Sequence, residues 1–215
     1  MLFRSLHNLT ELHLEGTPVR DGHLIHLREM PQLTMLNIAR TEVRGGFDRG
    51  ARAPAMSSVW QLRQLTALDL SGLHLQPVAL TIPRGAAAEL RSLRLSGAKV
   101  TDDGLKQLSG MTSLHDLSLD STQVTSEGLK HLTWMAELER LDLADTFVGN
   151  PGLKVLRGLA SLKSLSLRGT GVDDAGMAEL QGLKRLEFLD LAGSKVTASG
   201  AEELRRQFPN CKIEY

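Results

Sequence analysis

Residues 114–137 read LHDLSLDSTQVTSEGLKHLTWMAE, a stretch in which leucines, a threonine, a valine and a glycine hold fixed positions. The same pattern recurs along almost the whole chain. Its first leucine falls at Leu9, Leu33, Leu65, Leu90, Leu114, Leu138, Leu162 and Leu186. The gaps between these leucines are 24, 32, 25, 24, 24, 24 and 24 residues. A period this regular predicts a repeat protein, in which each unit stacks only on its neighbours.

Each unit combines two kinds of periodicity. The L-x-x-L-x-L part alternates at two residues, which predicts a strand with one buried face. The glycine–leucine part that follows, as in 152–159, repeats its apolar residues every three positions, which predicts a short helix or 3₁₀ turn. Stacked units bury their leucines by pairing the strands into a parallel sheet with the helices outside. We therefore expect an α/β solenoid, shaped like a horseshoe, with the sheet on the concave face and the short helices on the convex face.

The two ends of the array follow from the same period. One more step of 24 residues from Leu186 places a ninth strand at the end of the chain, with Ile213 and Tyr215 in its apolar positions. At the other end, Phe3 and Leu6 match the end of an outer helix, so the chain begins within a unit. Because repeat arrays need a polar cap for solubility, we expect an N-terminal extension or another subunit to cover this edge.

Polar residues at fixed positions predict how the turns satisfy their backbone groups. The hydroxyl after each strand is expected to bond the neighbouring turn, at Thr17, Thr41, Thr122, Thr146, Thr170 and Ser194. Short oxygen-bearing side chains before the outer helices are expected to cap the exposed helix amides, at 101–103, 125–127, 149–150 and 173–174. Pro151 suits a first helical turn.

Two places break the pattern, and they belong to neighbouring units. Counting back from Leu65 places the eight extra residues of the long gap between Val43 and Met56, where three glycines and Pro54 indicate a loop. This insertion, 44–55, is expected to leave the array at the edge after the strand. The unit 65–89 contains two prolines, which leave little room for a regular outer helix. We interpret the chain as a single domain, 1–215, of about eight repeats and a terminal strand.

Composition narrows the choice of partner. Lys plus Arg and Asp plus Glu number 25 each, so the formal net charge is zero. A neutral chain gives no electrostatic reason to expect nucleic acid or an anionic membrane surface. Apolar runs are far shorter than the ~18 residues that span a bilayer, and the first residues lack a secretory signal. The single cysteine, Cys211, allows no disulfide framework. We predict a cytoplasmic protein that binds neither nucleic acid nor membrane.

The units resemble leucine-rich repeats of the 24-residue kind that reads T-x-V-T-D-x-G-L. The match is clearest at AKVTDDGL, 98–105, and at SKVTASGA, 194–201, and it covers essentially the whole chain. Repeats of this kind are abundant in bacterial proteins and related to those of F-box-type adaptors. The resemblance implies a module that binds another protein. As an alternative it implies the substrate-recognition segment of a ubiquitin-ligase adaptor, or a secreted bacterial effector acting in the host cytosol.

The side chains that flank the buried leucines line the predicted concave face, where a partner protein would bind. The candidates on this face are Glu11, His13, Asp69, Arg94, Asp116, Asp120, Arg140, Asp142, Arg168, Phe188 and Asp190. Arg94, Arg140 and Arg168 are the expected anchors, because arginine is enriched at interface hot spots. The alternative is that neighbouring strands neutralise one another, with Arg140 beside Asp116 and Arg94 beside Asp69 or Asp116.

The loop 44–55 is a second candidate surface, since functional residues concentrate on loops held by a rigid scaffold. Arg44, Phe47, Arg49 and Arg52 are suited to grip an acidic groove of the partner. The alternative is an idle insertion, because a long loop costs little entropy.

Two aromatic residues have competing interpretations. Phe188 is either a further anchor on the concave face or a contact for the last turn, through Lys212 and Tyr215. Trp134 stands on the outer face where other units have glycine, and we expect it to cover its neighbouring turn rather than a ligand.

Residues that carry chemistry are sparse. Glu11, His13 and Glu15 point the same way but fall short of a zinc site with its supporting partners. Cys211 lies in the final turn with no histidine after it, and no nucleophile or phosphate-binding motif occurs. We therefore expect a non-catalytic protein without cofactor or metal, and an enzyme or metal-binding protein is the weaker alternative.

Overall fold

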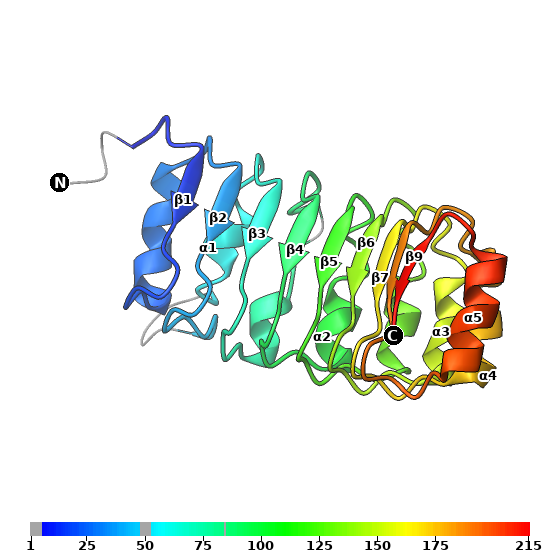
Figure 1. Cartoon of the computed structure of the whole chain (residues 1–215). Coiled ribbons are helices and arrows are strands. Elements are labelled where there is room, and N and C mark those ends of the chain that lie inside the picture. The colour runs from blue at the N-terminus through cyan, green and yellow to red at the C-terminus, as the bar shows by residue number, and fades with distance from the viewer. Residues whose placement is uncertain (1–5, 48–52, 84) are drawn as a thin grey trace.

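The computed structural model describes residues 6–47, 53–83 and 85–215. Within these ranges, nine strands pair in chain order into one open parallel sheet (Figure 1). The strands are β1 (Glu11–His13), β2 (Met35–Asn37), β3 (Ala67–Asp69), β4 (Ser92–Arg94), β5 (Asp116–Ser118), β6 (Arg140–Asp142), β7 (Ser164–Ser166), β8 (Phe188–Asp190) and β9 (Lys212–Glu214). The predicted solenoid is confirmed. In β9 Ile213 is buried as expected, whereas Tyr215 lies outside the strand and is 51% exposed.

Short helices form a second layer behind the sheet (Figure 1). The described residues form the 3₁₀ helices η1 (Asp21–Glu29), η2 (Pro77–Leu80), η3 (Gly128–Leu132) and η4 (Ala178–Gly182). They also form the α-helices α1 (Ser57–Trp60), α2 (Asp102–Gln107), α3 (Asn150–Leu156), α4 (Asp174–Met177) and α5 (Ala198–Gln207). The sheet therefore lies on the concave face and the helices on the convex face, as the two periodicities predict.

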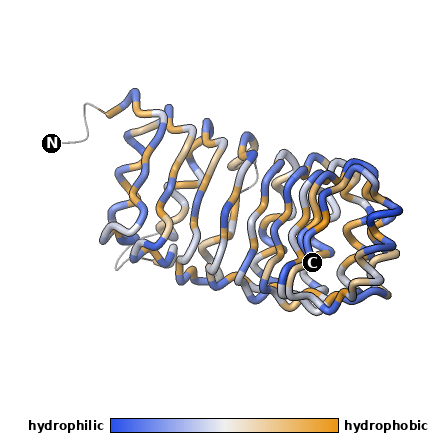
Figure 2. The backbone as a smooth tube through the Cα atoms, in the orientation of Figure 1, coloured by the Kyte–Doolittle hydropathy of each residue, from blue (hydrophilic) through white to orange (hydrophobic). Residues whose placement is uncertain are grey.

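The leucine ladders form one continuous core between the two layers. Leu117, Leu141, Leu165 and Leu189 stand opposite one another on adjacent strands and are at most 2% exposed. Figure 2 shows apolar positions returning in every turn along the solenoid. Fully burying one leucine contributes roughly 1.5–3 kcal/mol. The stability of each turn therefore comes from the turns on either side of it.

The hydroxyl ladder satisfies the turn to which it belongs. The Thr122 hydroxyl donates to the Leu119 carbonyl at 2.6 Å, and Thr146 donates to Leu143 at the same distance. Thr17, Thr41 and Thr170 do the same three residues back. The expected bond to the neighbouring turn is wrong, because the chain bends sharply after the strand and brings its own carbonyl within reach of the hydroxyl.

The polar residues before the outer helices mainly join neighbouring turns. Asp102 accepts hydrogen bonds from the Thr125 amide at 2.9 Å and from the Thr125 hydroxyl at 2.7 Å. Asp174 repeats this arrangement with the amide and hydroxyl of Thr197, at 2.8 and 2.6 Å. We call these contacts inter-turn bridges. The expectation that these side chains cap their own helices holds for Asp173, which accepts from the Ala175 amide. Thr125 accepts the Glu127 amide at 3.2 Å just before η3. The expectation is wrong for α2 and α3, whose N-termini have no side-chain cap.

The inter-turn bridges explain the glycine of the repeat. A methyl group added at Gly128 would overlap Oδ1 of Asp102, the oxygen that accepts the Thr125 amide. At Gly200 it would overlap the corresponding oxygen of Asp174. Glycine is thus needed here for space rather than for an unusual backbone angle.

Hydrogen bonds fix the insertion 44–55 at its base and connect its unit to the irregular unit 65–89. The amides of Arg44 and Gly45 both donate to Asp21, and the Ala55 amide donates to the Gly46 carbonyl at 2.8 Å, closing the base of the insertion. In the next unit η2 is only four residues long. Trp60 is 3% exposed and its Nε1–H donates to the Ala79 carbonyl at 3.1 Å, so this indole occupies the space behind the shortened helix.

A search of the described residues for membrane-spanning segments finds no helix of sufficient length and apolarity.

Replacing Gly128 by alanine should weaken the fold. Its methyl group would force Asp102 to swing away and release Thr125, so we expect the free energy of unfolding to fall by about 1–3 kcal/mol. Gly110→Ala is the control, because a Cβ there meets no atom within 4 Å. Denaturant unfolding should show no loss for this control, and equal losses for the two variants would contradict the bridge explanation.

Candidate functional site

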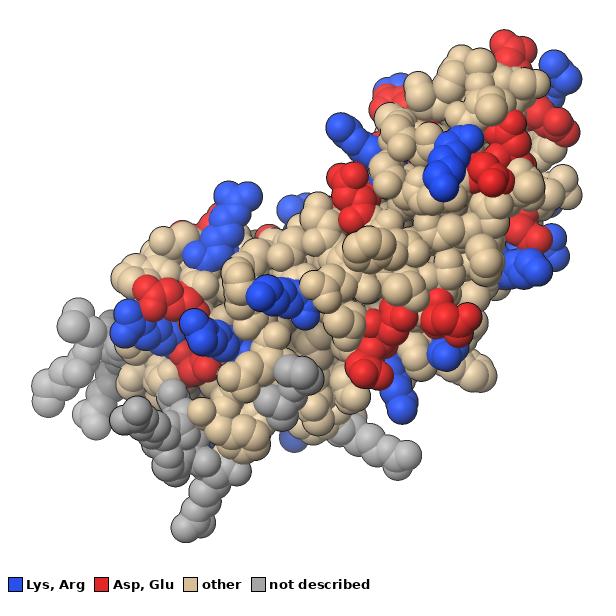
Figure 3. Space-filling model, turned by 90° about the horizontal axis from the view of Figure 1, so that it is seen from below, with Lys and Arg blue, Asp and Glu red and all other residues tan. Residues whose placement is uncertain are grey.

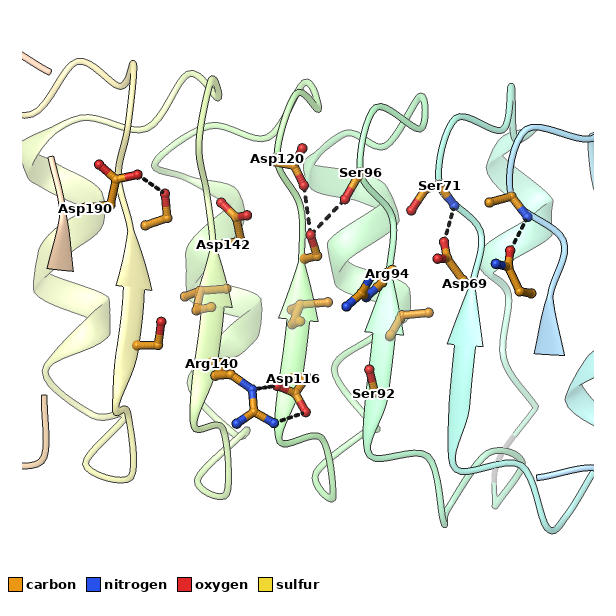
Figure 4. Close-up of a pocket in the computed structure, with 18 of the residues that line it drawn as sticks. Asp69, Ser71, Ser92, Arg94, Ser96, Asp116, Asp120, Arg140, Asp142 and Asp190 are labelled. Atoms are coloured by element: carbon orange, nitrogen blue, oxygen red, sulfur yellow. Dashed lines mark hydrogen bonds and ion pairs between the residues drawn. The ribbon is translucent and has the colours of Figure 1, made fainter. Parts of the chain in front are cut away.

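A groove of about 850 Å³ runs along the concave face across strands β2 to β8 (Figure 4). It brings together eight of the residues selected from the sequence, namely Asp69, Arg94, Asp116, Asp120, Arg140, Asp142, Phe188 and Asp190. Glu11, His13 and Arg168 lie outside it, the first two on β1 and the third just beyond β7. The parallel register produces this gathering, since residues 24 apart become neighbours across the sheet.

Arg140 is held by the adjacent strand. Its Nη2 donates to Asp116 Oδ2 at 2.8 Å and its Nε donates to Oδ1, a bidentate pair (Figure 4). The hydrogen bonds from this pair raise the pKa of Arg140. Mutual neutralisation by neighbouring strands is therefore confirmed for Arg140 and Asp116. An exposed pair of this kind contributes about 0–1 kcal/mol.

Arg94 and Arg168 carry the free positive charges of the face. Both are exposed, and neither side chain forms a hydrogen bond or ion pair with any residue that the structure describes. Arg94 stands opposite Asp69 in the sheet, yet the Asp69 carboxylate accepts the Ser71 amide at 2.9 Å instead (Figure 4). The predicted pairing of Arg94 with Asp69 or Asp116 is wrong, because Arg140 occupies one carboxylate and a backbone amide engages the other.

Side-chain oxygens at the ends of several strands fix the turns that follow. Asp69, Asp142 and Asp190 each accept the amide two residues ahead, at 2.9, 3.0 and 2.9 Å. Asn37 makes the same bond to the Ala39 amide at 2.9 Å. The structural task therefore requires an acceptor oxygen and not a negative charge.

Asp120, two residues beyond the end of β5, is held by a serine hydroxyl instead of a backbone amide. The Ser118 hydroxyl donates to Asp120 Oδ1 at 2.8 Å and lies 2.8 Å from the hydroxyl of Ser96 (Figure 4). Ser166 donates weakly to Asp190 at 3.5 Å. Serines therefore separate the carboxylates along this part of the groove.

Asp142 sits in an environment that disfavours its charge. Burial raises the pKa of Asp142 above its ordinary value, and the negative charges of Asp120 and Asp190 raise it further. Hydrogen bonds from the Ala144 amide and the Ser166 hydroxyl oppose this effect only in part. No lysine or arginine among the described residues forms an ion pair with Asp142.

The aromatic contacts at the carboxyl-terminal end involve two separate rings. The Lys212 ammonium lies 5.6 Å from the ring centre of Phe188, so the contact expected between Phe188 and the last turn is present. Tyr215 is covered instead by Arg205, at 4.8 Å. Phe188 remains partly exposed at the end of the groove. Its ring is therefore still accessible to a partner as the predicted anchor.

The insertion forms a second surface, away from the groove. Arg44 is exposed and lines a hollow of about 610 Å³ with Arg20 and His74, while Phe47 is 59% exposed. Arg49 and Arg52 lie outside the described residues. Figure 3, seen from below, shows basic and acidic side chains intermixed over this side of the molecule. The two candidate surfaces are therefore distinct.

Sequence reasoning missed Arg40, which lines the groove although it follows β2 in the turn. Its Nη1 lies 3.4 Å from Glu15 Oε1. The backbone of Arg40 has φ of 54°, a conformation that favours glycine. Glycines occupy the matching positions of other turns, and counting them in steps of 24 would have revealed Arg40.

The remaining titratable residues do not gather into a ligand set. Among the residues described, no three histidine, cysteine, aspartate or glutamate side chains converge as metal ligands would. His13 lies 3.9 Å from Glu11, a two-membered contact. Burial raises the pKa of the Cys211 thiol to about 11, so at neutral pH it stays protonated and poorly nucleophilic. The described face offers charge and hydrogen bonding rather than a reacting group.

Comparison with known proteins supports this architecture. A family model described as leucine-rich repeat matches residues 89–109 and 158–180. The crystal structure of internalin C2 from Listeria monocytogenes superposes with a TM-score of 0.72 at 18% identity, covering 99% of this chain and 83% of that one. No curated protein matches the sequence significantly. At this identity the structural likeness shows the fold.

Asp142→Asn should stabilise the protein at neutral pH. A folded-state pKa above the unfolded value means that ionisation destabilises the folded state, so the penalty is absent below the unfolded pKa and develops as pH rises through the folded pKa. Asparagine keeps the acceptor oxygen, as Asn37 does. We expect a gain of no more than about 1 kcal/mol at pH 7, since partly exposed charges are screened, and no gain in acid.

Asp69→Asn is the matched control for this measurement. Asp69 makes the same bond to the amide two residues ahead, but its partners across the sheet are Asn37 and Arg94, which bring no like charge. Thermal unfolding as a function of pH would refute the electrostatic explanation if Asp142→Asn were no more stable than wild type at pH 7, or if both variants gained equally.

Proposed function

We propose that this leucine-rich-repeat protein is a non-catalytic interaction module that binds a partner protein through its concave face, with a second contact at the loop 44–55. The observation that carries the proposal is a sheet face that no described element covers, on which a groove presents unpaired charges. Such a preformed surface binds with little ordering cost, because its side chains stand on paired strands.

The dimensions of the groove favour a macromolecular partner. From β2 to β8 it crosses six inter-strand spacings of about 4.8 Å, or roughly 30 Å. A standard protein interface buries about 800 Å² on each side, which a face of this length is able to supply. Small-molecule sites, in contrast, are enclosed and mostly apolar, whereas aspartate, arginine and serine dominate this lining.

Arg94 and Arg168 are the proposed arginine anchors, since Arg140 is engaged by Asp116. Arg44 and Phe47 are the described residues that would serve the contact at the insertion. The chain would use the same face if it were the recognition segment of a ubiquitin-ligase adaptor or a secreted effector. The identity of the captured partner would distinguish these alternatives from a simple interaction module.

The test is affinity capture of a partner, followed by binding measurements with charge-reversed variants. We expect Arg94→Glu with Arg168→Glu to weaken the captured partner by at least about tenfold, as arginine hot spots do. The charge-matched control reverses Arg63 and Arg185, two exposed arginines that make no ion pair among the described residues. This control should bind like wild type, and equal weakening by both double variants would indicate a mere net-charge effect.

A separate deletion tests the insertion. Removing residues 47–54 would join Gly46 to Ala55, whose backbones are already hydrogen-bonded at 2.8 Å, and would restore the 24-residue spacing. We expect weaker partner binding with an unchanged unfolding midpoint. If neither the deletion nor the arginine variant affects the captured partner, both contact surfaces are wrong.

A further inference from the structure

The charges on the concave face are unbalanced although the whole chain is neutral. Among the described residues, six carboxylates and three arginines line the groove, which leaves an excess of three negative charges. Two of the arginines are used internally, Arg140 by Asp116 and Arg40 by Glu15. The third, Arg94, is free.

The excess is concentrated between β5 and β8. Asp120, Asp142 and Asp190 line this part of the groove, and no lysine or arginine of the described chain forms an ion pair with any of them. Arg168 follows β7 on the same face, outside the groove lining, and adds one positive charge that is not paired with them. Their partners in the structure are serine hydroxyls and backbone amides. Asp142 and Asp190 occupy the same register position on β6 and β8, with Ser166 of β7 between them, and Asp120 lies two residues beyond Ser118, the residue opposite Asp142.

The negative charge on this line has no structural role of its own. Asn37 fixes its turn with the same bond, at 2.9 Å, that Asp142 makes at 3.0 Å. Three carboxylates that form no ion pair nevertheless repel one another, and burial beneath a partner would increase that penalty. A partner that brings a cation would remove it, whereas an anionic or wholly apolar partner would aggravate it.

We propose that the sheet face between β5 and β8 receives a segment of the partner protein that carries lysine or arginine, whose basic side chains pair with the carboxylates of Asp120, Asp142 and Asp190. This inference rests on the proposed function and specifies the chemistry of the partner. The groove is open along the solenoid axis, so an extended segment is able to lie across the strands. Arg94, on β4, and Arg168, just beyond β7, limit how many basic side chains this face accepts.

The test uses three labelled peptides of one length, which alternate serine with lysine, glutamine or glutamate. Fluorescence anisotropy at low ionic strength should show that the lysine peptide binds and the other two do not. The triple variant Asp120→Asn, Asp142→Asn and Asp190→Asn should weaken the lysine peptide by at least about tenfold, because each cation contact is lost. Asparagine preserves the acceptor oxygens, and a thermal melt confirms that the variant is folded.

The matched control neutralises three exposed acids outside the groove, with Glu89→Gln, Asp103→Asn and Glu203→Gln. It changes the net charge equally and should leave lysine-peptide binding unchanged. Lack of lysine-peptide binding, equal weakening by both triple variants, or tighter binding of the glutamate peptide or of duplex DNA would overturn the inference.

The captured partner separates this inference from the proposed function. If partner binding depends on Arg94 and Arg168 but tolerates the three asparagine substitutions, the inference fails and the proposed function stands. If it tolerates both sets and the loop deletion, both fail. Loss of partner binding with the asparagine variant, together with retention by the matched control, supports the basic segment.

Discussion

Stacking of near-identical turns around a shared aliphatic interior is the interaction on which the rest of the structure depends. A strand of three residues and a helix of four to ten residues are too short to be stable alone. When Leu117 stands beside Leu141 and Leu165, each turn completes the burial of the next. The same register places each strand residue beside its counterpart in the next repeat, so the polar side chains of the surface are arranged in columns.

The remaining fixed residues of the repeat form hydrogen bonds with backbone groups that the sheet and helices leave unpaired. A threonine hydroxyl closes each tight turn on its own carbonyl, as Thr122 does on Leu119. An aspartate then crosses to the next turn, as Asp102 does to Thr125. Glycine follows because that carboxylate fills the space where a Cβ would be. Each fixed residue of the repeat thus answers a specific steric or hydrogen-bonding demand.

The concave face carries charges that the fold itself does not require. Strand ends need an acceptor oxygen, which Asn37 supplies without charge, yet Asp142 supplies it as a carboxylate in a site that disfavours ionisation. Retaining an unneutralised charge where an amide would serve is a destabilising choice, and such choices concentrate at surfaces used for binding. The arginines of the groove differ in the same way. Arg140 is paired with Asp116 within the protein, whereas the Arg94 side chain is free to contact a partner.

The sequence alone determined the period, the strands and the columns of the concave face, because apolar spacing is a local property that stacking converts directly into register. It even located the final strand at Lys212–Glu214. Only the tertiary structure decided which charges meet: Arg140 forms an ion pair with Asp116 whereas Arg94 forms none with Asp69, although both pairs stand directly opposite each other on adjacent strands. It also turned the threonine hydroxyls toward their own turns, carried Asp102 across to the next one, and brought Arg40 into the groove. These outcomes depend on side-chain directions and on distances of an ångström or so between turns, which residue spacing does not encode.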